Sequence, residues 1–188
     1  MSGLLLLGLL IALGGCGEPA GRPLDLFVGL DTSGSAEGEK ARFYKQTLDA
    51  NKRVLASPEG STLEIYRFDD AVHEIHVGSA IDQPSQLAQK LREALNPAQA
   101  TRGTNLLKFM ETVDGRLAGA TGEAKILVLT DCGTELMTPK EFGVMETMAK
   151  RWAKEGAVKE MRISGLRPLH RDVLRKRLGA LGSRLVLE

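Results

Sequence analysis

Short apolar segments alternate along the sequence with segments of helical periodicity, and this alternation restricts the chain to few folds. Strand patterns are predicted at residues 24–30, 61–68, 71–77, 125–130, 158–166 and 184–187. Helical patterns are predicted at residues 37–56, 84–95, 104–117, 139–155 and 168–181. Strands that alternate with helices favour an open, mostly parallel sheet with helices on both faces. We therefore expect an α/β fold with a doubly wound, six-stranded sheet.

Two of the predicted strands are apolar enough for the centre of such a sheet. Residues 24–30 carry a single charge, and residues 125–130 contain the run Ile-Leu-Val-Leu, a pattern typical of strands buried on both faces. The segments 61–68 and 71–77 are separated only by the turn residues Asp69-Asp70, which predicts an antiparallel hairpin. The expected sheet therefore has one antiparallel strand at its edge.

The size and charge of the chain exclude several classes of protein. A length of 188 residues suits one domain of ordinary size. Apolar residues make up 43% and charged residues 26%, which excludes a wholly disordered chain and a membrane protein with several spans. The net charge of +1 argues against a nucleic-acid partner, because neutralising phosphates needs a concentrated basic surface.

The N-terminus resembles the leader of a bacterial lipoprotein. Residues 4–13 are almost all large aliphatics, a length that suits a signal-peptide core and is about half of a spanning helix. Leu13-Gly14-Gly15-Cys16 resembles a lipobox, whose cysteine is lipidated and becomes the new N-terminus. We expect a signal peptide at 1–15, a tether at 16–23 with lipidated Cys16, and an exported domain at 24–188 anchored to a bacterial membrane. A cleaved secreted protein and an uncleaved anchor remain open.

Side chains rich in oxygen gather where the two apolar strands end. Asp-Thr-Ser-Gly-Ser directly follows the first of these strands, an Asp follows the second, and a Thr stands at the start of the predicted helix 104–117. If the two strands are neighbours, both carboxylates emerge at the sheet edge where open α/β sheets bind ligands. Carboxylates and hydroxyls are hard donors that suit Mg²⁺ or Mn²⁺. The candidate metal ligands are Asp31, Ser33, Ser35, Thr104 and Asp131.

These residues, in this order, resemble the metal-ion-dependent adhesion site of a von Willebrand factor type A (vWA) domain. The family signature is Asp-x-Ser-x-Ser, then a Thr, then an Asp that closes a central strand. The likeness covers roughly residues 24–188, which is nearly all of the expected mature chain. The resemblance implies a Rossmann-like fold. It implies that Ser33 and Ser35 ligate directly, that Thr104 ligates directly or through water, and that Asp31 and Asp131 act mainly through waters.

The resemblance also implies a function. In the family, a carboxylate from a partner fills the open position on the cation, and no nucleophile is required. We therefore expect a membrane-anchored, extracytoplasmic module that binds a protein partner presenting an acidic residue, and not an enzyme. The family commonly has Asp-Gly after the last central strand, whereas this chain has Asp131-Cys132-Gly133. Cys132 is expected to be a small buried residue, with a thiol near the metal as the alternative.

Other interpretations of the segment 31–35 stay open. Alone, it would fit a turn with a helix N-cap. A phosphoryl-transfer enzyme with a strand-end Asp nucleophile needs a second Asp two residues later, where this chain has Ser33. The sequence has neither Gly-x-Ser-x-Gly nor a Walker loop. The alternative function is a metal-dependent hydrolase of phosphoesters or esters, and a third is a scaffold that folds without binding metal.

Two further groups of residues have a simple structural explanation. His73 and His76 stand three apart on a predicted strand, which predicts opposite faces and no shared zinc ion. Residues 150–177 hold an excess of Lys and Arg, which we interpret as solvated helix faces. Contact of this basic segment with anionic lipid headgroups or an acidic partner is the alternative.

Overall fold

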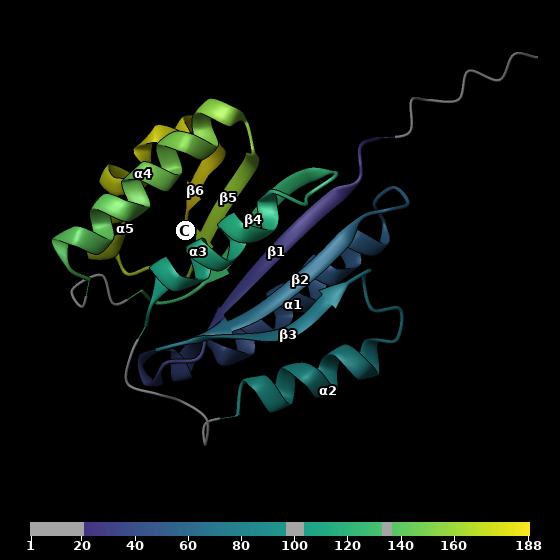
Figure 1. Cartoon of the computed structure of the whole chain (residues 1–188). Coiled ribbons are helices and arrows are strands. Elements are labelled where there is room, and N and C mark those ends of the chain that lie inside the picture. Colours follow the sequence, from purple (N-terminus) through teal and green to yellow (C-terminus); the bar gives the residue numbers. More distant parts are fainter. Residues whose placement is uncertain (1–20, 97–103, 133–136) are drawn as a thin grey trace, which may run out of the picture.

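The computed structural model describes residues 21–96, 104–132 and 137–188 (Figure 1). The predicted signal peptide, Cys16 and most of the predicted tether lie outside these ranges, so the structure does not test them. Within the described ranges, none of the helices has the length and apolar character needed to cross a membrane.

The described residues form one six-stranded sheet with the strand order β3-β2-β1-β4-β5-β6. Strand β3 runs antiparallel to β2, and every other neighbouring pair is parallel. The predicted α/β class with one antiparallel edge strand is therefore confirmed. The strands are β1 (Leu24–Asp31), β2 (Thr62–Phe68), β3 (Val72–Gly78), β4 (Glu123–Leu129), β5 (Val158–Ser164) and β6 (Leu185–Leu187).

Helices cover both faces of this sheet (Figure 1). One face carries α1 (Lys40–Leu55) and α2 (Pro84–Ala94), and the other carries α3 (Leu106–Leu117), α4 (Pro139–Glu155) and α5 (Pro168–Leu178). Successive side chains of β1 enter the two cores in turn: Val28 and Leu30 pack on the α1 side, and Phe27 packs on the α3 side. Strand β1 is therefore buried on both faces, as its apolar sequence predicts.

The pairing of β1 with β4 brings the two predicted site segments together. Leu30 pairs with Leu129, so Asp31, the last residue of β1, and Thr130, the first residue after β4, come next on the two neighbouring chains. Strand order reverses between β1 and β4, because β2 and β3 lie on one side of β1 and the later strands lie on the other. The carboxyl ends of β1 and β4 therefore meet at the switch point where this class of sheet binds ligands.

The start of the first helix differs from the prediction of one helix over residues 37–56. A 3₁₀ helix, η1 (Gly34–Glu39), comes first, and the α-helix begins only at Lys40. Gly34 and Gly38 account for the difference, since glycine is a poor α-helix former and this turn has no side-chain cap.

Two other helix ends also differ from the sequence-based prediction. The helix predicted at 104–117 begins at Leu106, because the side chain of Asn105 accepts a hydrogen bond from the Lys108 amide and caps the helix there. The helix predicted at 168–181 ends at Leu178 and continues as the 3₁₀ helix η4 (Gly179–Arg184), which Gly182 interrupts with φ 59°.

Candidate functional site

Four of the five predicted metal ligands form a continuous line of hydrogen bonds at the carboxyl edge of the sheet. The Ser33 amide donates to Oδ1 of Asp31 at 2.8 Å, which closes the turn after β1. Oγ of Ser33 lies 3.1 Å from Oγ of Ser35, and Oγ of Ser35 donates to Oδ1 of Asp131 at 3.0 Å. The structure therefore brings together Asp31, Ser33, Ser35 and Asp131.

The line of side chains starts in the protein interior and reaches the surface at Ser35. Asp31 is fully buried and Ser33 is 2% exposed, whereas Ser35 is exposed to solvent. Asp131 lies between these extremes, at 6% exposure. A ligand can therefore reach the hydroxyl of Ser35 from solvent, while the carboxylate of Asp31 stays fixed in the interior.

The hydroxyl of Ser33 does not act as a helix cap. Ser33 directly precedes η1 and has the extended backbone of a capping residue, yet its side chain makes no capping hydrogen bond. Its Oγ contacts Ser35 instead. The simple explanation of this segment as a turn with an N-cap therefore does not account for the position of the Ser33 hydroxyl.

The residue that follows Thr104 is tied to the same edge through Asp69. The Asn105 amide donates to the carbonyl of Asp69 at 3.0 Å, which fixes the chain just before α3. Oδ2 of Asp69 accepts from the Thr32 hydroxyl at 3.3 Å, within the Asp31–Ser35 segment. The sequence pattern predicts only a turn at Asp69. In the structure Asp69 is buried, and its backbone carbonyl and its carboxylate together tie the start of α3 to the segment that holds the predicted serine ligands.

Two residues at the site were not singled out by sequence analysis. Oγ1 of Thr130 donates to Oδ2 of Asp31 at 2.5 Å and accepts from the Cys132 amide at 2.8 Å. Nη2 of Arg167 donates to Oδ2 of Asp131 at 3.0 Å. Thr130 directly precedes the predicted ligand Asp131 in the sequence, and this position could have identified it as a site residue. Arg167 is 36 residues away from Asp131 in the sequence, within the basic segment 150–177. Its position in that segment does not indicate a contact with Asp131.

The electrostatics of the site favour the arrival of a cation. Burial raises the pKa of Asp31, and the hydrogen bonds from Ser33 and Thr130 oppose this rise. The negative charge of Asp131 raises the pKa of Asp31 further, because two carboxylates at one edge repel each other. A bound divalent ion would remove this repulsion.

The spacing and chemistry of the oxygens fit a small hard cation. Ligands at about 2.1 Å from Mg²⁺ in octahedral geometry lie about 3 Å from each other. The hydroxyl oxygens of Ser33 and Ser35, which lie 3.1 Å apart, have this spacing. Among the described residues, His, Cys, Asp and Glu form no metal-binding group of three, so His73 and His76 belong to no such cluster. The donors that fit are hydroxyls and two carboxylates.

Cys132 follows the site as a buried residue, as expected. It is 1% exposed and belongs to the core on the α3 side of the sheet. Its backbone has φ 53°, in the left-handed region that favours glycine. This is the position at which the vWA resemblance leads us to expect a glycine. This chain therefore has a left-handed residue at this position and places a buried thiol there.

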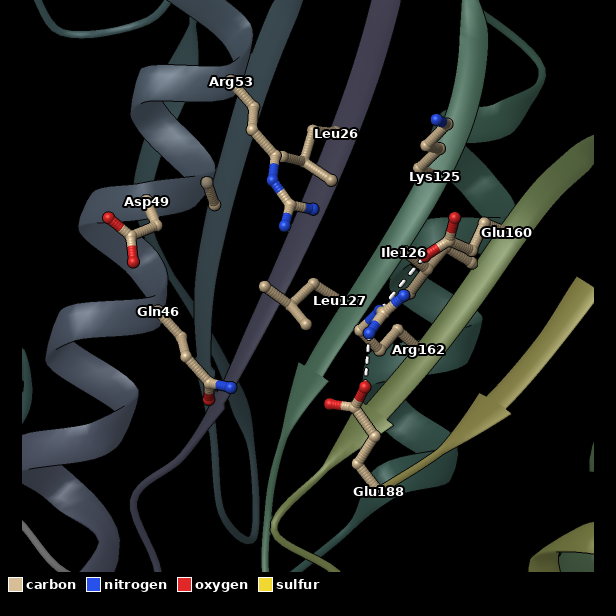
Figure 2. Close-up of a pocket in the computed structure, with 11 residues that line it drawn as sticks. Leu26, Gln46, Asp49, Arg53, Lys125, Ile126, Leu127, Glu160, Arg162 and Glu188 are labelled. Atoms are coloured by element: carbon tan, nitrogen blue, oxygen red, sulfur yellow. Dashed lines mark hydrogen bonds and ion pairs between the residues drawn. The ribbon is translucent and has the colours of Figure 1, made fainter.

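A cavity of about 230 Å³ lies elsewhere, between α1 and strands β4 and β5 (Figure 2). Leu26 and Leu127 line it, and Arg162 pairs there with Glu160 and Glu188. Three acidic and three basic side chains line this cavity, so their formal charges give it no preference for one sign. We therefore place the candidate functional site at the carboxyl edge and not in this cavity.

Comparisons with known proteins find the same fold but no close relative. No protein-family model and no curated protein matches the sequence. Among solved structures, the PilB minor pilin from Streptococcus sanguinis is similar, with a TM-score of 0.66 and 13% identity over 89% of this chain and 57% of that chain. A von Willebrand factor type A structure from Catenulispora acidiphila has a TM-score of 0.64 and 16% identity over 89% of this chain and 39% of that chain.

A third similar structure is of proximal thread matrix protein 1 from the mussel byssus, solved with a zinc-occupied MIDAS (metal-ion-dependent adhesion site) motif. Its TM-score is 0.58, with 13% identity over 90% of this chain and 44% of that chain. This chain spans about two fifths to three fifths of the length of these three proteins. At such identities the likeness establishes the fold, which is that of vWA domains.

Proposed function

We propose that this protein is a binding module that recognises a protein partner through a divalent cation, Mg²⁺ or Mn²⁺. The observation that supports the proposal best is the line of oxygens from Ser33 through Ser35 to Asp131, because these hard donors meet at one edge of the sheet and Ser35, in the middle of the line, is exposed to solvent. A carboxylate from the partner would complete the coordination of the cation.

Each of the five predicted ligands has a role in this proposal. Ser33 and Ser35 would ligate the cation through their hydroxyls, and Thr104 would ligate directly or through water. Asp31 and Asp131 would act mainly through waters. When bound, the cation supplies positive charge, and a site with few direct carboxylate ligands leaves enough of this charge to attract an anionic oxygen.

We also propose that the module works outside the cytoplasm, anchored to a bacterial membrane by lipidated Cys16. The apolar leader and the lipobox-like sequence before Cys16 support this location. Structures of the same fold from a minor pilin and a byssal thread matrix protein are consistent with such a role.

Crosslinking and capture from membranes tests the proposal. The full chain is captured in Mg²⁺ and again in a chelator, as wild type and as Asp31→Ala, Asp131→Ala and Asp172→Ala. Asp172 is the matched control, since its side chain is 84% exposed on α5. A partner should be captured by wild type and Asp172→Ala in Mg²⁺ only, and lost in the other two variants. A set of captured proteins unchanged by the chelator and by both site variants would refute the cation-bridged model.

The alternative function is a metal-dependent hydrolase, and the same variants distinguish it. Under our proposal the protein turns over no ester, consistent with Ser33 at the position where a phosphoryl-transfer enzyme needs its second Asp. Hydrolysis of p-nitrophenyl phosphate or p-nitrophenyl acetate is measured with Mg²⁺ and with Mn²⁺. Turnover by wild type that Asp31→Ala abolishes would replace the binding model with the enzymatic one.

A further inference from the structure

Arg167 places a guanidinium group beside the candidate metal site. It occupies the last position of the three-residue connection between β5 and α5, where it is the N-cap residue of α5. Nη2 donates to Oδ2 of Asp131 at 3.0 Å. The Arg167 side chain is 61% exposed, whereas that of Asp131 is 8% exposed. A guanidinium has five N–H donors, so this contact leaves most of them available.

The two oxygens of Asp131 are divided between two partners. Oδ1 accepts from the Ser35 hydroxyl, on the side of the predicted ligands, and Oδ2 accepts from Arg167. Arg167 therefore offsets part of the negative charge that the site offers to a cation. This weakens cation binding, and it leaves the loaded site with more positive charge for an arriving anion.

We propose that Arg167 is the second anion-binding group of this site. The inference rests on the function proposed above. The partner carboxylate would give one oxygen to the cation and the other to the guanidinium of Arg167, whose planar fork matches a carboxylate. The partner is thus recognised at two points, and the preferred ligand is a carboxylate that can use both oxygens.

A structural role for Arg167 would give different results from this proposal. If the guanidinium only held Asp131 in place, its removal would weaken cation binding. If it is the second anion-binding group, its removal should strengthen cation binding about three- to tenfold, because a repelling charge is lost from a partly exposed position. The same change should weaken carboxylate binding to the loaded site. Opposite changes in the two affinities therefore identify the proposed role.

The experiment measures both affinities on the full chain, as wild type, Arg167→Gln, Arg167→Lys and Arg175→Gln. Calorimetry with Mn²⁺ alone gives the metal affinity. Acetate is then titrated into the loaded protein, and its binding is followed by the fall in water-proton relaxation as it displaces water from Mn²⁺. Arg175 is the matched control, because it lies two turns further along α5 and is 67% exposed.

Arg167→Gln is expected to bind Mn²⁺ more tightly and acetate at least threefold more weakly, with Arg167→Lys intermediate for acetate and Arg175→Gln unchanged. Acetate affinity within twofold of wild type, or weaker Mn²⁺ binding, in Arg167→Gln would overturn the proposal. Failure of the wild type to bind Mn²⁺ would instead refute the cation-dependent function on which this proposal rests. The two failures are thus separate results.

Discussion

The hydroxyl of Thr130 donates to the carboxylate of Asp31 at 2.5 Å, and both side chains are fully buried. The contact joins the first residue after β4 to the last residue of β1. The same hydroxyl accepts from the Cys132 amide, so it also fixes the turn that carries Asp131. Thr130 is therefore a positioning residue for both carboxylates of the candidate site.

Thr130→Val is expected to lower the free energy of unfolding by about 2 kcal/mol, because it leaves a buried carboxylate oxygen and a buried amide without this partner. Urea unfolding measures this loss, and calorimetry should show Mg²⁺ binding weakened severalfold. Thr47→Val is the matched control: its hydroxyl is also buried, and it donates to the Phe43 carbonyl within α1. Equal Mg²⁺ affinities in wild type and Thr130→Val would show that Thr130 does not position the site.

Mg²⁺ should stabilise the folded protein increasingly as its concentration exceeds its dissociation constant. At ten times its dissociation constant, the ion adds about 1.4 kcal/mol to the free energy of unfolding by mass action. Urea unfolding with Mg²⁺ and with a chelator measures this gain, which Asp131→Asn should reduce. Asp172→Asn, on the surface of α5, should respond like wild type. Identical unfolding curves with and without Mg²⁺ would favour the scaffold that binds no metal.

Much of the site follows from local sequence patterns combined with one topological rule. Asp31 and Asp131 each close an apolar strand, and parallel neighbours end at the same edge, so their proximity could be predicted once the strands were taken as neighbours. Ser33 and Ser35 then follow from their distance to Asp31 along the chain. The structure places these four side chains together as expected, because their proximity depends on backbone direction and hardly on side-chain conformation.

The rest of the site depends on register and on the path of a connection, which local patterns do not encode. The Thr130 hydroxyl reaches Asp31 because Leu30 pairs with Leu129. A shift of the register by one residue would turn the Thr130 side chain to the other face of the sheet. The contact of Arg167 depends on the path between β5 and α5. The predicted start of α3, at residue 104, is two residues too early. Thr104 and Asn105 are both good N-cap residues, and the structure uses Asn105, so that the helix begins at Leu106.

The left-handed backbone of Cys132 predicts an unusual order of variant stabilities. Cys132→Gly should change the free energy of unfolding by less than about 1 kcal/mol, since relief of the strained φ offsets the lost burial of the thiol. Cys132→Ala keeps the strain and loses the thiol, and should cost about 1 kcal/mol. Cys132→Val adds a β-branch at positive φ and should cost most. Urea unfolding measures the series, and a valine variant as stable as the glycine variant would contradict this explanation.

Gly29 lets α3 approach the centre of β1. A Cβ at this position would lie 2.8 Å from Cζ of Phe109, whose ring stacks on that of Phe68. Gly29→Ala should therefore lower the free energy of unfolding by about 1 to 3 kcal/mol through overpacking. Phe109→Leu should cost less in the Gly29→Ala background than in wild type, because it removes the clashing ring atoms. A double-mutant cycle by urea unfolding measures the coupling, and additivity within about 0.5 kcal/mol would rule out the clash.

Tyr66 predicts a loss of stability in alkali that one substitution should remove. Burial raises the pKa of Tyr66 above its ordinary value of 10.0, and the neighbouring carboxylate of Glu64, which accepts a hydrogen bond from its hydroxyl, raises the pKa further. As pH rises past 10, the unfolded state therefore loses the proton first, and the stabilisation present at lower pH is lost. From about pH 9 to 11, the free energy of unfolding should fall more steeply in wild type than in Tyr66→Phe. Urea unfolding across this range measures both slopes, with Tyr44→Phe as the control, and parallel slopes would show that Tyr66 does not contribute to the alkaline loss.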